Sequence, residues 1–216
     1  MKLFLDTANL DDIRAAARLG VIHGVTTNPT LISREKGDFA SIIREIASLV
    51  DGPVFAEVIA ADAEGMIREG RELAAVDKSV TVKIPMTEAG LTAVSTLSKE
   101  GISVCCTLVF SAAQALLASN AGARYVAPFI GRFDDIGYDG IEAVASIADV
   151  LADGEFGTEV VAASVRSPLH AVEAAKAGAD IATVPPKALF QMIRHPLTDA
   201  GLAKFMKDWA ESGRAL

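Results

Sequence analysis

The stretch VTVKIPMTEAGLTAVSTLSKEGISVCCT, residues 80–107, contains the repeating unit that determines the fold of this chain. It begins with a β-rich run at 80–84 and ends with a second one at 103–107. The segment between them carries apolar residues at i, i+3 and i+6, the spacing of one helix face: Leu91, Val94 and Leu97. A strand, a helix and a strand in this order predict a parallel βαβ unit.

The same unit recurs along the whole chain. We expect eight strands, at residues 2–5, 24–27, 54–58, 80–84, 103–107, 124–129, 159–163 and 180–184. Helix start signals precede the intervening segments at Thr87, Ser111 and Ser167. Glycines follow them at Gly20, Gly101, Gly122 and Gly178. Eight regular units predict an α/β fold, a single closed (β/α)8 barrel. A doubly wound open sheet is the rival, but no GxGxxG motif follows the first strand.

The last segment, residues 198–216, is an additional amphipathic helix in this reading. Its apolar residues share one face: Leu202, Phe205, Met206 and Trp209. Two arrangements are open, a helix that caps the barrel or one that reaches a neighbouring subunit. No linker or low-complexity run interrupts the sequence, so residues 1–216 are predicted to form one domain that includes this segment.

Composition limits the classes of function. The 216 residues are 51% hydrophobic and carry a net charge of -8, which argues against nucleic acid as the main partner. No apolar run approaches a membrane span, and the first residues do not resemble a signal peptide. Cys105 and Cys106 are adjacent and form no sensible disulfide, so a cytoplasmic location is expected.

In a (β/α)8 barrel the chemistry lies at the carboxyl ends of the strands, and seven of the eight predicted strands end near a polar side chain. These side chains are Asp6, Thr27 with Asn28, Glu57, Lys83, Thr107, Arg132, and Ser164 with Arg166. The eighth strand ends in Thr183-Val184-Pro185 and offers little polarity.

Lys83 is the most informative of these residues. It lies inside a β-branched strand, where a charged amine is costly to bury. One interpretation is an amine nucleophile that forms a Schiff base with a carbonyl substrate. The alternative is a structural lysine that extends from the strand end or pairs with Glu57.

Two carboxylates near such an amine suggest divided proton-transfer roles. Asp6, however, could instead cap the first helix, whereas Glu57 lies between apolar residues and fits a solvated face poorly. Thr107 could hold a water molecule or simply reflect β-propensity, and Asn28 could orient a substrate hydroxyl or shape the turn before Pro29.

Arg132, Ser164 and Arg166 follow the sixth and seventh strands, where barrels often bind phosphate. A guanidinium offers a planar fork for phosphate oxygens, and surface ion pairs with Asp134 and Asp135 are the alternative. The histidines are scattered without metal-ligand spacing, and the adjacent cysteines point to opposite strand faces, so no metal site is expected.

With these residues in place, the sequence resembles the small-subunit transaldolases and the related fructose-6-phosphate aldolases over essentially the whole chain. The motifs that carry the resemblance are LDTAN at 5–9, GVTTNPT at 24–30, VKIPMT at 82–87, TLVFS at 107–111, PFIGR at 128–132 and AASVR at 162–166.

The resemblance implies class I aldolase chemistry in a (β/α)8 barrel without metal or other cofactor. It implies that Lys83 forms the Schiff base, that Asp6 takes the proton from the C4 hydroxyl, and that Glu57 and Thr107 hold a water. It assigns substrate contacts to Asn28, Thr27, Phe129, Arg132, Ser164 and Arg166. Sugar phosphates are the implied substrates, and a homo-oligomer, a decamer of two pentameric rings, is the implied assembly.

Two positions help to choose within the family. Glu57 and Phe129 resemble transaldolases, whereas the aldolase relatives have glutamine and tyrosine there. A phenylalanine ring cannot transfer a proton to the bound enamine, so the three-carbon fragment should persist until an acceptor arrives. Ala127 departs from the pattern, since many transaldolases have serine there. A fructose-6-phosphate aldolase that releases free dihydroxyacetone and a non-catalytic sugar-phosphate-binding barrel are the rival functions.

Overall fold

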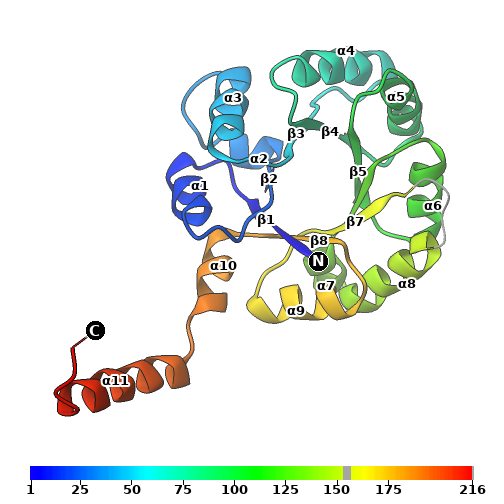
Figure 1. The fold of residues 1–216 in the computed structure, drawn as a ribbon. Coiled ribbons are helices and arrows are strands. Elements are labelled where there is room, and N and C mark those ends of the chain that lie inside the picture. Colours follow the sequence, from blue (N-terminus) through cyan, green and yellow to red (C-terminus); the bar gives the residue numbers. More distant parts are fainter. Residues whose placement is uncertain (153–156, 216) are drawn as a thin grey trace.

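The computed structural model describes residues 1–152 and 157–215, and in this part of the chain eight parallel strands close into a barrel (Figure 1). Each strand pairs with the next, and β1 pairs with β8 to complete the ring. The strands are β1 Lys2–Asp6, β2 Val25–Thr26, β3 Val54–Glu57, β4 Val80–Pro85, β5 Val104–Val109, β6 Tyr125–Pro128, β7 Glu159–Ala162 and β8 Ile181–Val184. The predicted (β/α)8 barrel is confirmed, and the open doubly wound sheet is wrong.

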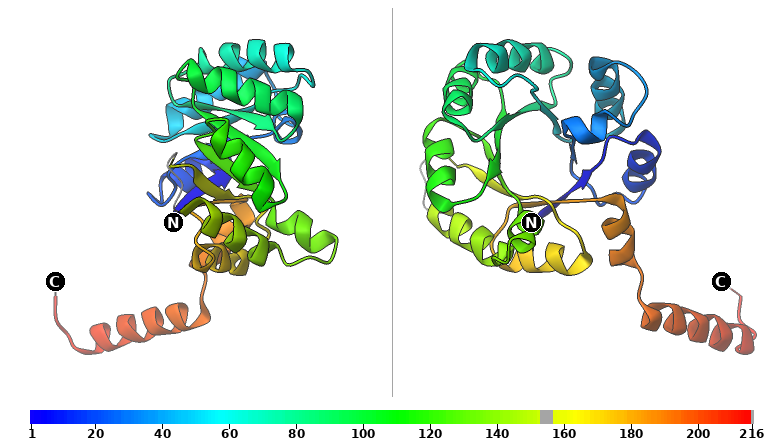
Figure 2. Two further views of the ribbon diagram at one scale, coloured as in Figure 1. Left: turned by 90° about the vertical axis from the view of Figure 1, so that its right-hand side faces the viewer. Right: turned by 180° about the vertical axis from the view of Figure 1, so that it is seen from behind.

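The helices form a ring around the barrel, as Figures 1 and 2 show. Eight of them follow the strands in turn: α1 Leu10–Ala17, α3 Phe39–Leu49, α4 Ala63–Ala74, α5 Glu88–Lys99, α6 Ala112–Asn120, α8 Gly140–Ala152, α9 Pro168–Lys176 and α10 Pro186–Ile193. Two short helices, α2 Pro29–Ile32 and α7 Ile130–Asp135, stand directly after β2 and β6 at the carboxyl ends of these strands.

Local signals fix the helix ends as expected. The side-chain oxygens of Thr87, Ser111 and Ser167 accept hydrogen bonds from the first-turn amides of α5, α6 and α9. The glycines at the predicted stops, Gly20, Gly101, Gly122 and Gly178, all have positive φ angles. Glycine adopts this backbone conformation at no steric cost, and it ends the helix there.

The alternation of side chains along the strands divides the core in two. One cluster fills the inside of the barrel and includes Phe4, Phe55, Cys105 and Tyr125. The larger cluster lies between the strands and the helices, and Cys106 belongs to it. The two neighbouring cysteines therefore point to opposite faces of β5, as the period-two geometry of a strand requires.

The filled interior determines where chemistry can occur. Asp6, Glu57 and Thr107 each lie two residues beyond an inward-facing residue of this cluster, toward the carboxyl end of the strand. They therefore face the carboxyl mouth of the barrel, above an apolar floor.

The C-terminal helix α11, Pro196–Glu211, lies apart from the barrel (Figures 1 and 2). It begins at Pro196, two residues before the predicted start, because His195 caps it and proline suits the first turn. None of its residues, all of which the structure describes, is buried. The helix does not cap the barrel, so that alternative is wrong. Leu216, the end of the predicted segment, lies outside the described residues.

Among the described residues, no helix has both the length and the apolar character that a membrane crossing requires.

Candidate active site

Lys83 stands at the centre of the carboxyl mouth. Its side chain is only 7% exposed, and its Nζ lies 3.0 Å from Oε2 of Glu57. The same Nζ donates a hydrogen bond of 2.9 Å to the backbone carbonyl of Thr27. Lys83 and Glu57 are register partners on β4 and β3, so the sheet itself places the amine beside the carboxylate. The carboxylate of Glu57 is therefore in contact with the amine and is the group placed to exchange protons with it.

Asp6 lies partly buried at the end of β1 and does not cap the first helix. The cap of α1 is Asn9, whose side chain accepts from the amides of Asp11 and Asp12. The carboxylate of Asp6 instead accepts a hydrogen bond of 2.7 Å from the hydroxyl of Thr26.

The environment of Asp6 changes its acidity. Burial raises the pKa of the Asp6 carboxyl, the hydrogen bond from Thr26 and the positive charge of Lys83 oppose this, and the negative charge of Glu57 adds to it. A carboxyl with a raised pKa is a stronger base in its ionised form, which suits a proton acceptor.

Thr107 holds a hydroxyl group that is fully buried. Its Oγ1 has no hydrogen-bond partner among the described residues. It lies two residues beyond Cys105, the register partner of Lys83, and so reaches the same mouth. The strand is irregular directly after it: the register shifts between Thr107 and Val109, and Leu108 has a φ of 58°. A buried hydroxyl ordinarily has a partner, and this one is left without a protein partner at the same end of the barrel as Lys83.

A second group of polar residues lies at the neighbouring corner, where β6 and β7 end. The guanidinium of Arg166 pairs with both carboxylate oxygens of Asp135, at 2.5 and 2.6 Å. The guanidinium of Arg132 stands 5.1 Å from the centre of the Phe129 ring. Asp135 is therefore paired with Arg166. Arg132 instead stacks on the ring of Phe129.

Ser164 and Gly131 bring this corner together. Ser164 has a φ of 58°, unusual for a residue with a side chain, and its carbonyl accepts from the amide of Gly131 at 3.2 Å. A Cβ at position 131 would lie 2.5 Å from Nε of Arg166, so only glycine allows this guanidinium to lie against α7. Ser164, Arg166 and α7 therefore form one packed unit.

The side chains of Thr27 and Asn28 both make hydrogen bonds within the protein. The hydroxyl of Thr27 is fully buried and donates to the carbonyl of Phe55, so Thr27 meets Lys83 only through its backbone. The side-chain oxygen of Asn28 accepts from the amide of Leu31 and caps α2.

Two further threonines, which the strand-end pattern does not single out, also lie at the mouth. The hydroxyl of Thr26 contacts Asp6, and it also lies 2.6 Å from the hydroxyl of Thr183. The prediction that β8 adds little polarity is therefore wrong. The period-two alternation of β2 and β8 was the available signal, because it places both threonines on the inner face of the barrel.

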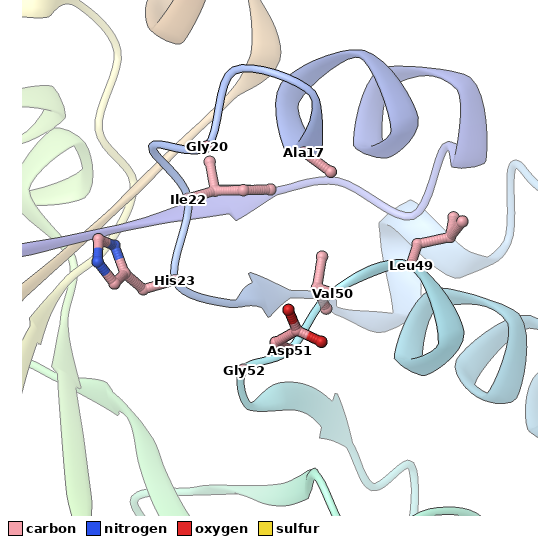
Figure 3. A pocket seen from close by; sticks show the side chains of 8 residues that line it. All are labelled: Ala17, Gly20, Ile22, His23, Leu49, Val50, Asp51 and Gly52. Atoms are coloured by element: carbon pink, nitrogen blue, oxygen red, sulfur yellow. The ribbon is translucent and has the colours of Figure 1, made fainter.

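A different hollow, shown in Figure 3, lies away from these residues. It is lined by Ala17, His23, Leu49 and Asp51, among others, and so lies beside the amino ends of β2 and β3, at the opposite end of the barrel from Lys83. In residues 1–152 and 157–215, no three His, Cys, Asp or Glu side chains are grouped so that they could hold a metal ion.

The fold and the polar mouth define a (β/α)8-barrel enzyme whose centre is a buried amine. The sequence model of the Transaldolase/Fructose-6-phosphate aldolase family matches residues 3–216, and the chain belongs to this family.

Similar proteins agree with this placement. The chain is 57% identical over 213 residues to a "Probable transaldolase" of Thermoanaerobacter sp. (strain X514), covering 99% of both chains. It is 58% identical to a "Probable transaldolase" of Clostridium acetobutylicum, covering 98% of this chain and 99% of the relative. A mandelate oxidase mutant solved with an FMN adduct shares the fold alone, with a TM-score of 0.59 and 15% identity over 86% of this chain and 64% of the other.

Proposed function

We propose that this enzyme is a transaldolase that transfers a dihydroxyacetone unit between sugar phosphates, as in the pentose phosphate pathway. The overall reaction converts sedoheptulose 7-phosphate and glyceraldehyde 3-phosphate into erythrose 4-phosphate and fructose 6-phosphate. The family match and the named relatives agree with this assignment. The observation that carries the chemistry is the buried amine of Lys83, 3.0 Å from the carboxylate of Glu57.

The first step forms a Schiff base. Neutral Lys83 attacks the C2 carbonyl of the ketose phosphate, and the carbinolamine loses its hydroxyl as water to give the iminium ion. Glu57 is in contact with the nitrogen, and the unpartnered hydroxyl of Thr107 faces the same mouth. We assign to these two residues the water that carries protons between the nitrogen and the departing oxygen.

The second step breaks the bond between C3 and C4. Asp6 removes the proton of the C4 hydroxyl, the C4–O bond becomes a carbonyl, and the electron pair of the C3–C4 bond moves into the iminium to form an enamine. The aldose phosphate then leaves. The enamine carbon attacks the aldehyde of a second aldose phosphate, and the proton held by Asp6 passes to the oxygen of that aldehyde, which becomes the new C4 hydroxyl. Hydrolysis of the new iminium ion then releases the product ketose phosphate and restores Lys83.

The corner of Arg132, Ser164 and Arg166 is proposed to bind the substrate phosphate. A guanidinium matches phosphate oxygens with two parallel N–H donors. Arg166 already uses two donors on Asp135, whose pKa this contact holds below the usual range. Binding of phosphate therefore requires either the remaining donors of Arg166 or an exchange of partners. We assign the remaining contacts with the three-carbon unit to Asn28, Thr27 and Phe129.

A coupled assay tests transfer against simple cleavage. Fructose 6-phosphate is supplied with and without erythrose 4-phosphate, and both glyceraldehyde 3-phosphate and free dihydroxyacetone are measured. A transaldolase forms sustained product only when the acceptor is present. Rapid release of dihydroxyacetone without acceptor would instead identify the fructose-6-phosphate aldolase activity.

Replacing Phe129 by tyrosine is expected to raise free dihydroxyacetone release at the cost of transfer. Phe129 packs against the cluster inside the barrel and lies beneath Arg132, and we expect a hydroxyl added to its ring to lie in the mouth. This hydroxyl could protonate the enamine or organise the water that hydrolyses the imine. The ratio of free dihydroxyacetone to transferred product measures the effect. Phe133→Tyr on α7 is the control, and an unchanged ratio in Phe129→Tyr contradicts the role given to this ring.

We further propose that the chain acts as one domain in a cytoplasmic homo-oligomer, with a decamer of two pentameric rings as the expected form. Two free, buried cysteines suit a reducing compartment. The exposed apolar residues of α11 support assembly: Leu197, Leu202, Phe205, Met206 and Trp209. A large apolar face of this kind is typical of a surface that another chain covers.

Replacing Phe205 by aspartate is therefore expected to reduce the number of subunits in the particle. The Phe205 side chain is 70% exposed on α11, and a charge at this position would oppose burial of the helix against another copy. Light scattering coupled to gel filtration measures the mass. Lys207→Asp, two positions after Phe205 and therefore on the other side of α11, is the matched control and should leave the mass unchanged. An unaltered mass in the Phe205 variant contradicts the assembly through α11.

A further inference from the structure

Two buried hydroxyls lie beneath the Asp6 carboxylate and connect it to both neighbouring strands. In the sheet, β1 lies between β2 and β8. Thr26 is the register partner of Asp6 on β2, and Thr183 comes from β8. Their hydroxyl oxygens are 2.6 Å apart, so the two side chains meet across the inner face of β1. Thr26 and Thr183 are 2% and 3% exposed, which excludes bulk water from this contact.

We propose that Thr26 and Thr183 are positioning residues that hold Asp6 in the ionised form and orientation needed to accept the C4 hydroxyl proton. The proposal rests on the proposed role of Asp6 as the base of a transaldolase. Neither threonine is assigned contact with the substrate.

The direction of the hydrogen bonds follows from the chemistry of the groups. An ionised carboxylate can only accept, so Thr26 donates its single hydroxyl proton to Asp6. The remaining contact requires Thr183 to donate to Thr26. A chain in which each hydroxyl both accepts and donates is strengthened by mutual polarisation.

The reversed chain is less favourable. If Asp6 were protonated and donated to Thr26, then Thr26 would donate to Thr183. The hydroxyl proton of Thr183 would then lack an acceptor, because its contact with Thr26 is the only hydrogen bond that its hydroxyl makes in the described part of the chain. A buried donor without a partner is costly. A carboxyl protonated on its other oxygen can still accept from Thr26, but a hydrogen bond to an ionised oxygen is the stronger one. The pair of threonines therefore favours the carboxylate and counteracts the effect of burial.

Two other charged groups affect the pKa of Asp6, in opposite directions. The titratable groups that affect it are Lys83 on β4, which favours the carboxylate, and Glu57 on β3, which opposes it. These two residues contact each other, whereas the hydrogen bond that the Asp6 carboxylate makes in the described part of the chain comes from Thr26. Threonine is β-branched and has few rotamers in a strand, which makes Thr26 and Thr183 rigid supports.

Replacing Thr26 by valine tests the proposal, because valine keeps the shape and removes the hydroxyl. We expect kcat to fall about 10- to 100-fold, the range for a lost hydrogen bond to a charged group. The acid limb of the pH profile of kcat/KM should move to higher pH, since the pKa of Asp6 loses a contribution that lowers it. Borohydride trapping of fructose 6-phosphate on Lys83 should remain, because this step does not use Asp6.

The controls separate positioning from a general structural effect. Thr183→Val should move the acid limb in the same direction by less, and Thr26→Ser should restore it. Thr81 lies two residues before Lys83 on β4 and is as buried as Thr26. Thr81→Val therefore removes a buried hydroxyl, one that contacts Ser103 rather than Asp6. It should leave the acid limb in place. A Thr26→Val profile that coincides with the wild type, or a shift of the same size in Thr81→Val, overturns the proposal.

A failure of the proposed function gives a different result. If the wild-type protein does not transfer the three-carbon unit, the transaldolase assignment fails by itself. The carboxyl ¹³C titration of Asp6, assigned with Asp6→Asn, then tests the positioning without any turnover. Its midpoint must rise in Thr26→Val and stay constant in Thr81→Val. Equal midpoints in all three proteins overturn the role of the threonines.

Discussion

Replacing Lys83 by arginine is expected to lower kcat by roughly 10⁴-fold or more, because the proposed reaction loses its nucleophile. Arginine keeps the positive charge and could still pair with Glu57, which lies 3.0 Å from the lysine nitrogen. Its guanidinium, however, stays protonated in proteins and cannot form the Schiff base. The loss of activity in this variant therefore separates the role of Lys83 as a nucleophile from the role of its positive charge.

Borohydride reduction in the presence of fructose 6-phosphate provides the direct measurement. The wild-type protein should gain a stable adduct on the peptide that contains Lys83, and the arginine variant should gain none. Lys176→Arg is the matched control, since Lys176 lies exposed on α9 and pairs with Glu173. An adduct on another lysine, or turnover that persists in Lys83→Arg, would assign the chemistry elsewhere. Absence of any adduct in the active-site peptide of the wild type would favour a sugar-phosphate-binding barrel.

Replacing Asp6 by asparagine is the second change with a large expected effect, a fall in kcat of about 10²- to 10⁴-fold. The amide has nearly the shape of the carboxyl but cannot remove the proton from the C4 hydroxyl. Lys83 and its contact with Glu57 remain, so Schiff-base formation should persist. We expect the variant to accumulate the borohydride-trapped adduct without releasing aldose phosphate. Asp149→Asn on the surface of α8 should behave as the wild type.

The same variant should be more stable than the wild type at neutral pH. Burial raises the pKa of Asp6 above its ordinary value of 3.8, so folding favours the neutral form of this group. The wild type therefore loses stability as the pH rises from 3.8 through the folded-state pKa, and a neutral amide avoids this loss. A higher Tm at pH 7 that disappears below about pH 4 is the expected result. A Tm that is lower at pH 7 than that of the wild type argues against the desolvation of Asp6.

Much of the fold could be predicted from local patterns. The alternation of β-rich runs with helical stripes is repeated eight times, and parallel strands with this spacing have few ways to bury both faces. Capping residues such as Thr87 and stop glycines such as Gly101 act within one turn of the chain, so their effect is visible in the sequence. Lys83 stood out because a charge is rare in a buried strand.

Contacts between residues that are far apart in the sequence could not be predicted from local patterns. The sequence around Asp6 fits a helix cap and an active-site carboxylate equally well, and its hydrogen bond with Thr26 shows that it faces the barrel. The pairing of Asp135 with Arg166 depends on Gly131, because a side chain at that position would collide with the Arg166 guanidinium. The place of α11 depends on packing with surfaces that local periodicity does not describe.

The sequence by itself therefore determined the barrel, the helix ends and most of the polar residues at the carboxyl mouth, since each depends on residues close together in the chain. Only the tertiary structure decided which of them touch: Lys83 with Glu57, and Asp6 with Thr26 and Thr183. The physical reason is that closure of the barrel sets the register between strands and brings residues 6 and 183 to the same point. Hydrogen bonds and charges act over a few ångströms in space, whatever the separation of the residues along the chain.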